Sequence, residues 1–131
     1  MPIHVSAERA TTSILRYPPL SGSPGIPIYH SKDMKNWELY SHALTNAEDP
    51  DLKKLPSAKG IWAPCLTYCE ADDLFYVVYG VMNSMNARYF DVDNYLITAK
   101  DLRGPWSEPV YLHSSGFDAS MFHDDDGKNI L

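Results

Sequence analysis

Two loop-to-strand segments of this chain follow one pattern: Gly60-Ile61-Trp62-Ala63-Pro64 and Ser115-Gly116-Phe117-Asp118-Ala119-Ser120. Each segment is followed by an apolar–polar alternation, an acidic turn and a second strand-like run. An alternation with a period of two is typical of a half-buried β-strand. The run after the first segment, Leu74-Phe75-Tyr76-Val77-Val78-Tyr79, is rich in the aromatic and β-branched residues that strands favour. The sequence therefore predicts an all-β fold.

An internal repeat extends this pattern along the chain. Two segments that each lead to a tryptophan match one another: Ile28-Tyr29-His30-Ser31-Lys32-Asp33 before Trp37, and Leu96-Ile97-Thr98-Ala99-Lys100-Asp101 before Trp106. A weaker match sets Trp62-Ala63-Pro64 against Phe117-Asp118-Ala119. Repeats at such spacing are typical of β-propeller blades, each of four strands. Two ordinary hairpins with similar turns are the alternative explanation.

The expected strands divide into blades. Ile61 to Leu112 supplies four strands and hence one whole blade, with a loop of mixed character expected at Met82 to Val92. Ile28 to Ala43 fits the outer part of a preceding blade, and Ala119 to Leu131 fits the inner half of a following one. A closed propeller needs at least about four blades. We therefore expect a partial propeller with unpaired strand edges, which would favour a homo-oligomer formed by edge pairing.

Charge and composition argue against several classes of partner. The 131 residues carry a formal net charge of −6, and the basic residues form no run longer than Lys53-Lys54. An acidic surface repels phosphate backbones, so we expect no nucleic-acid partner, whereas a neutral sugar is not disfavoured. The segment Met1 to Ala10 lacks the apolar part of a signal peptide, and no stretch is long enough to span a membrane. These features predict a cytoplasmic protein without a membrane partner.

Neither the cysteines nor the acidic residues indicate a disulfide or a metal site. Cys65 and Cys69 on one strand would lie roughly 13 Å apart, beyond the about 7 Å that a disulfide spans, so we expect free thiols. Asp124-Asp125-Asp126-Gly127 predicts a hairpin turn, and it fails as a calcium loop because Phe122 stands at the first ligand position. No paired metal spacing occurs among the histidines, which are His4, His30, His42, His113 and His123. We expect no metal and no cofactor.

A further series of segments occurs in order along residues 24–131. Its members are Pro24-Gly25-Ile26-Pro27-Ile28-Tyr29-His30-Ser31-Lys32-Asp33, Asn36-Trp37, Gly60-Ile61-Trp62-Ala63-Pro64, Asn94-Tyr95-Leu96-Ile97-Thr98-Ala99, Gly104-Pro105-Trp106-Ser107, Ser114-Ser115-Gly116-Phe117-Asp118 and Phe122-His123-Asp124-Asp125-Asp126-Gly127. The series resembles the glycoside hydrolase family 43 enzymes, in particular their β-xylosidase and α-arabinofuranosidase branch. The resemblance implies part of one five-bladed β-propeller catalytic domain over residues 1–131, with residues 1–23 as a divergent N-terminal segment and residues 24–131 as family-like blades.

The resemblance also implies a substrate class and roles for three residues. Members act on hemicellulose-derived pentosides and invert anomeric configuration with a general-base Asp, an auxiliary Asp and a general-acid Glu. The auxiliary Asp belongs to a Gly-Phe-Asp segment, which implies that Asp118 tunes the pKa of the acid. The Trp-Ala-Pro segment lines the sugar pocket, which implies substrate binding by Trp62 and, beside Asp118, by Phe117. From the residues alone, Asp118 could be a turn or capping residue, and Trp62 could be plain core packing.

The expected base and acid have no match in this sequence. The base of the family lies in an Asp-Pro-Ser segment upstream of the matching region, but no Asp precedes Asp33 here, and the acid Glu would fall beyond Leu131. Inverting hydrolysis needs both groups, about 6.5–9.5 Å apart, and each contributes about 10²–10⁴-fold to the rate. We therefore expect that the isolated chain does not turn over a pentoside. The alternative is a non-catalytic propeller fragment that binds sugar or self-associates.

Overall fold

A computed structural model describes residues 12–15, 25–44, 60–86 and 89–131 of the chain. The described residues form strands and turns without a helix. The strands are β1 (Thr12–Leu15), β2 (Ile26–Ser31), β3 (Glu38–Ala43), β4 (Ile61–Cys69), β5 (Leu74–Asn86), β6 (Tyr89–Ala99), β7 (Val110–His113), β8 (Phe122–His123) and β9 (Asn129–Ile130). The all-β prediction is confirmed. Among these residues, no helix has the length and apolar character that crossing a membrane requires.

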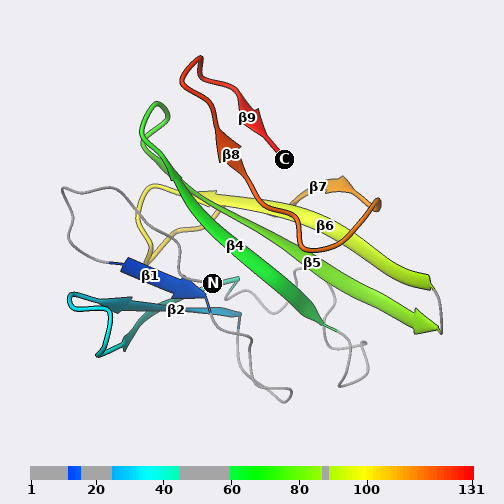
Figure 1. Cartoon of the computed structure of the whole chain (residues 1–131), viewed down its shortest axis with the longest axis horizontal. Helices are drawn as coiled ribbons and strands as arrows, with labels where there is room; N and C mark the ends of the chain where they lie inside the picture. Colours follow the sequence, from blue (N-terminus) through cyan, green and yellow to red (C-terminus); the bar gives the residue numbers. More distant parts are fainter. Residues whose placement is uncertain (1–11, 16–24, 45–59, 87–88) are drawn as a thin grey trace.

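The strands form three antiparallel sheets in chain order (Figure 1). The first sheet has the order β1-β2-β3, the second β4-β5-β6-β7, and the third is the hairpin β8-β9. Each strand pairs with its neighbour in sequence, which is the pattern of a blade. The middle sheet is the complete four-stranded blade that the sequence predicted between Ile61 and Leu112.

One sequence-based expectation about the second sheet is wrong, and another holds only in part. The expected loop at Met82 to Val92 is instead the far end of a long hairpin, because β5 runs on to Asn86 and β6 begins at Tyr89. A register shift between Met82 and Ser84 lets the two strands stay paired through polar residues that read as a loop. The sequence also predicts a strand from Trp106 to Leu112 that is broken by Pro109. The structure has a strand only after this proline, from Val110 to His113, since Pro109 has no N–H to give to the ladder.

The hydrophobic core lies between the first and second sheets. It is formed by alternate residues of the strands, which share one face of each sheet. The core residues include Ile26, Ile28 and Ala43 from the first sheet and Leu66, Phe75, Val77, Tyr79, Val81 and Ile97 from the second. Ile28, Val77 and Ile97 have no exposed surface. The two sheets are therefore packed face to face and share one core.

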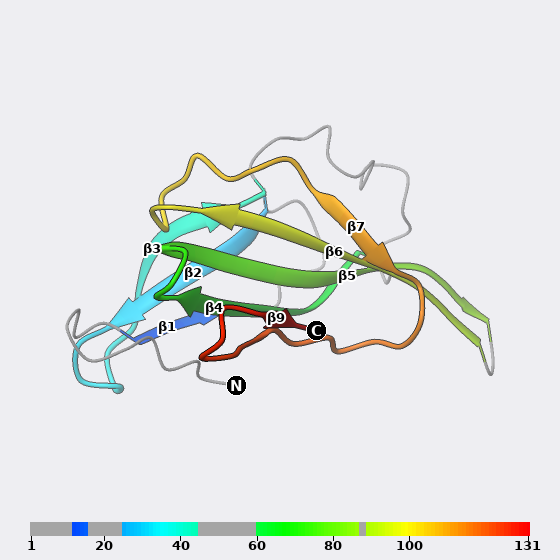
Figure 2. The ribbon, with the colours of Figure 1, turned by 90° about the horizontal axis from the view of Figure 1, so that it is seen from above.

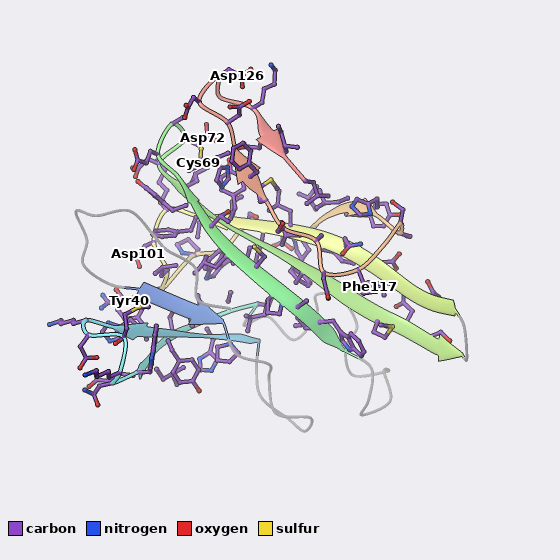
Figure 3. The ribbon with its side chains drawn as sticks, viewed as in Figure 1. Tyr40, Cys69, Asp72, Asp101, Phe117 and Asp126 are labelled. Atoms are coloured by element: carbon purple, nitrogen blue, oxygen red, sulfur yellow. The ribbon has the colours of Figure 1, made fainter. Side chains whose placement is uncertain are left out.

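Polar contacts join the same two sheets at one corner. Ser41 Oγ on β3 donates to the carbonyl oxygen of Leu102 over 2.5 Å. The Arg103 guanidinium lies over the Tyr40 ring, 4.7 Å from its centroid, a favourable cation–π geometry. Figure 3 shows Tyr40 and the turn that carries Asp101 at the same end of the molecule. The turn after β6 thus fastens the second sheet to the first.

The repeated Lys-Asp segments, Lys32-Asp33 and Lys100-Asp101, form the turns that close the outer strand pairs. In the first sheet, Asp33 Oδ1 accepts hydrogen bonds from the backbone N–H groups of Lys35 and Asn36 at 2.9 and 2.8 Å. These bonds, led by the one from Asn36, hold the pKa of Asp33 well below its usual range. In the second sheet, Asp101 Oδ1 accepts from the N–H of Arg103 at 2.8 Å. The same side chain therefore closes the same corner in both sheets.

The hairpin β8-β9 closes at the predicted Asp-Gly turn. The Asp124 N–H donates to the Lys128 carbonyl over 2.8 Å, and the Gly127 N–H donates to the Asp124 carbonyl over 3.0 Å. Gly127 has a φ of 80°, which a residue without a Cβ adopts at little cost. In Figure 3 this turn, marked by Asp126, is the far end of the hairpin.

A polar cluster of Thr67, Asp72, Tyr76, His123 and Asn129 connects the hairpin to the second sheet. His123 Nε2 lies 2.8 Å from Thr67 Oγ1, and His123 Nδ1 lies 2.6 Å from Asn129 Oδ1. An amide oxygen can only accept, so Nδ1 carries the ring proton and Nε2 accepts from the threonine. Tyr76 donates to Asp72 Oδ2 over 2.7 Å, and Asn129 Nδ2 lies 3.3 Å from the same oxygen. The bond from Tyr76 is the main reason that the pKa of Asp72 is lowered.

Candidate functional site

Four residues form one cross-strand row on the second sheet. Trp62 on β4 pairs with Gly80 on β5, Gly80 with Asn94 on β6, and Asn94 with His113 on β7. Directly opposed residues of antiparallel strands share a face of the sheet. Tyr79, next to Gly80, belongs to the core against the first sheet, so the row lies on the opposite face.

The segment between β7 and β8 crosses this second face. Figure 1 shows it passing in front of the sheet, and Figure 2, turned by 90°, shows it on the same side, alongside β4. Asn94 Nδ2 donates to the carbonyl oxygen of Gly116 over 3.1 Å and to that of His113 over 3.3 Å. The Asn94 side chain is fully buried. The sheet therefore holds the crossing segment directly before Phe117 and Asp118.

A second anchor lies at the start of the same segment. Ser114 Oγ donates to Asp93 Oδ1 over 2.5 Å, and the other carboxylate oxygen of Asp93 accepts from Asn83 Nδ2 over 2.7 Å. The Ser115 N–H donates to His113 Nδ1 over 3.2 Å, which fixes that ring nitrogen as an acceptor. The chain that leaves β7 is thus bonded to β6 at Ser114 and to the last residue of β7 at Ser115.

Both segments that the sequence singled out contain a strained residue at the equivalent position. Ala63, after Trp62, has a φ of 41°, and Asp118, after Phe117, has a φ of 59°. The left-handed region costs a residue with a Cβ about 1–2 kcal/mol, and such strain concentrates at functional sites. A register shift between Trp62 and Cys65 accompanies the first case. The weak sequence match between the two segments therefore extends to their backbone conformation.

The three residues proposed from the sequence differ in their surroundings. Trp62 is half-buried on the first strand of the second sheet, whereas Asp118 is exposed just before the first strand of the third. The Phe117 ring is 57% exposed and lies on the crossing segment (Figure 3). The structure brings the two segments to one face of the second sheet. Aromatic rings and a carboxylate are residue types suited to a sugar, whose C–H faces stack on rings while its hydroxyls donate to acceptors.

A hollow of about 230 Å³ lies elsewhere, at the turn between β2 and β3. Its walls include His30, Asp33 and Glu38. The Asp33 oxygens are already engaged by the N–H groups of the turn and by the Asn36 side chain. This hollow is therefore part of the corner between outer strands and lies apart from the row that contains Trp62. In the described part of the chain, no three His, Cys, Asp or Glu residues are grouped so as to hold a metal ion.

Sequence reasoning missed the central part of this row. No role was predicted for Gly80 or Asn94, and Gly and Asn are both depleted in strands. A glycine inside a strand often marks a close approach of another group. A Cβ added at Gly80 would lie 2.9 Å from Val92 Cγ1 and 3.7 Å from Asn94 Oδ1. The available signal was the presence of two residue types that strands disfavour. Only the pairing register shows that Gly80 and Asn94 lie opposite each other.

Comparisons with known proteins show the family of this chain. Residues 8–131 match the family described as Glycosyl hydrolases family 43. The chain belongs to this family. It is 46% identical over 108 residues to a β-xylosidase of Bacillus subtilis (strain 168), which covers 82% of the chain and 20% of that protein. It is 39% identical over 102 residues to a non-reducing end α-L-arabinofuranosidase of Bacteroides ovatus, which covers 75% of the chain and 18% of that protein.

Solved structures of family 43 give the same result for the fold. The crystal structure of a xylan β-1,4-xylosidase from Bacillus halodurans C-125 matches with a TM-score of 0.86 and 40% identity, over 98% of this chain and 23% of that one. This family 43 chain therefore spans about a fifth of the length of the curated relatives that it matches. The predicted partial five-bladed β-propeller is confirmed.

Proposed function

We propose that this chain forms one wall of a pentoside-binding centre in a glycosidase of the β-xylosidase and α-L-arabinofuranosidase type. The observation that carries the proposal is the bond from Asn94 to the Gly116 carbonyl. It ties the Phe117–Asp118 segment to the sheet face on which Trp62 lies. Relatives named as a β-xylosidase and an α-L-arabinofuranosidase support a pentose-containing oligosaccharide as the ligand.

Each residue of the wall has a distinct chemical role in this proposal. The Trp62 and Phe117 rings offer apolar faces to the C–H bonds of a sugar ring. Asp118 is an auxiliary carboxylate that accepts sugar hydroxyls and lies near the group that protonates the leaving oxygen. A nearby negative charge raises the pKa of a carboxylic acid, because ionising the acid would place two like charges together. Asp118 would thereby keep the acid protonated at neutral pH.

The wall by itself accounts for binding and orientation of the sugar. An inverting mechanism also needs a general base behind a water molecule and a general acid on the leaving oxygen. Asp118, in the auxiliary role, replaces neither group. We therefore propose that the isolated 131-residue chain binds a pentose without measurable turnover, and that hydrolysis of hemicellulose-derived pentosides belongs to the whole family 43 domain.

A titration with xylose and with arabinose tests this proposal. Indole N–H resonances report on Trp62 directly, and Trp37 serves as an internal control because its indole N–H donates to Met34 in the turn between β2 and β3. We expect sugar to shift the Trp62 resonance but not that of Trp37. The matched variants Trp62→Ala and Trp37→Ala should respectively lose and keep sugar binding. Equal shifts at both tryptophans, or none, would contradict the proposal, as would turnover of a nitrophenyl xyloside above the buffer rate.

A further inference from the structure

We propose that Asn94 is a positioning residue that sets the place of the Phe117–Asp118 segment relative to Trp62. The effect of Asn94 on sugar binding rests on the proposed function. Its role in holding the Phe117–Asp118 segment does not. Asn94 lies at the third position of the row and is fully buried. Its amide nitrogen is bonded to both ends of the turn that leaves β7, at His113 and at Gly116.

The orientation of this amide is fixed by its surroundings. Both close partners of Nδ2 are backbone carbonyl oxygens, at 3.1 Å for Gly116 and 3.3 Å for His113. Carbonyl oxygens only accept, so the side chain must present its two N–H donors to them. Reversing the amide would place Oδ1 against two acceptors. Among residues of this size and shape, only asparagine supplies two such donors: aspartate supplies none when ionised, and leucine supplies none at all.

The oxygen of the Asn94 amide makes the burial of this side chain costly. Asn94 Oδ1 is buried and has no hydrogen-bond partner. A buried acceptor without a partner is destabilising, and such groups are rare in proteins. The oxygen faces the bare backbone of Gly80, where an added Cβ would lie 3.7 Å from it and 3.8 Å from the Trp62 carbonyl oxygen. The amide therefore lies between the Gly116 carbonyl of one segment and the backbone of Gly80, which pairs with Trp62 of the other segment.

Asp118 lies two residues beyond the carbonyl that Asn94 holds. It has a strained φ of 59° and an exposed side chain, so little burial restrains it. The bonds of Ser114 and Ser115 restrain the segment only at its start. Removing the bond to Gly116 would loosen the backbone that leads to Asp118 while leaving the strands intact. Asn94 thus acts on the site through the backbone and does not need to touch the sugar.

Backbone order parameters of the full chain test the inference. In the wild-type protein we expect values of about 0.85, typical of rigid backbone, at Gly116, Phe117 and Asp118. Asn94→Leu keeps the size of the side chain and removes both donors, so the three values should fall below about 0.6. Ser41→Ala is the matched control, because it also removes a bond from a side chain to a loop carbonyl and should leave these three positions unchanged.

Asn94→Asp is a second test variant, because the number of donors that its side chain offers depends on pH. When ionised, the new side chain has no donor for the two carbonyls. When protonated, it has one, and burial together with the facing carbonyls raises the pKa of that carboxyl into an accessible range. Order at Gly116–Asp118 should therefore be near the wild-type level at low pH and, compared with the wild type and Asn94→Leu at the same pH, fall as pH rises, although His113 also contacts this segment.

The outcomes separate this inference from the proposed function. Wild-type order in Asn94→Leu, or a segment that is already mobile on the picosecond–nanosecond timescale in the wild type, overturns the inference. If Asn94→Leu does not fold, the pH response of Asn94→Asp decides instead. Equal order of the segment in the ionised and protonated forms of that variant overturns the inference. A xylose titration of the same samples then addresses the site. Absence of sugar binding in the wild type would refute the proposed function while the order parameters still decide the role of Asn94.

Discussion

Replacing Tyr76 with Phe should make the stability of the protein less sensitive to alkali between pH 10 and 12. The Tyr76 side chain is 8% exposed, and its hydroxyl donates to Asp72 Oδ2 over 2.7 Å. Burial, followed by the bond to Asp72, raises the pKa of Tyr76 from 10.0 to about 12. The folded protein therefore holds this proton more tightly than the unfolded chain does.

The sign and size of the effect follow from this difference. A raised pKa contributes stability that is complete below the unfolded value of 10.0 and is lost as pH rises through about 12. At about 1.36 kcal/mol per pKa unit, the loss at Tyr76 amounts to about 2 kcal/mol by the end of that range. At pH 8 the variant should be less stable than the wild type by about 1 kcal/mol, the value of one hydrogen bond. The two stability curves should therefore cross above pH 10.

Urea unfolding followed by tryptophan fluorescence at intervals from pH 8 to 12 measures both curves. Other tyrosines, including Tyr95, whose pKa is raised mainly by burial, contribute equally to both proteins and cancel in the difference. Tyr111→Phe is the control, because that ring is 54% exposed on an edge strand. Parallel curves for the wild type and Tyr76→Phe from pH 10 to 12 would refute the reasoning.

Two further predictions concern the packing of the sheets and the last turn. Ile28→Ala removes a fully buried side chain between the first and second sheets and should lower the free energy of unfolding by about 2–5 kcal/mol in urea titrations. Leu39→Ala, at a side chain that is 52% exposed, should cost less than about 0.5 kcal/mol, and equal costs would argue against a shared core. Gly127→Ala adds a Cβ that meets nothing within 4 Å but has to adopt a φ of 80°, so a cost of about 1–2 kcal/mol from backbone strain alone is expected. An unchanged melting temperature in that variant would be inconsistent with this account.

Much of the fold could be predicted from short stretches of sequence. Leu74 to Tyr79 is rich in aromatic and β-branched residues, so its assignment needed no partner strand. The Lys-Asp turns were found as a repeat because Asp33 and Asp101 bond to backbone groups only a few residues away. The extended ends of β5 and β6 were missed, since residues 82–86 and 89–92 are held in strands by one another and not by their own propensity.

The sequence by itself determined the strands, their closing turns and the two segments that contain Trp62 and Asp118. These features depend on side-chain periodicity and on bonds between near neighbours in the chain. Only the tertiary structure decided that Trp62, Gly80, Asn94 and His113 form one row, and that Asn94 holds the segment before Asp118. The physical reason is register: a shift of β6 by one residue against its neighbours would turn Asn94 toward the other face of the sheet. Register depends on how the strands pair and pack together, so it cannot be predicted from any single stretch of sequence.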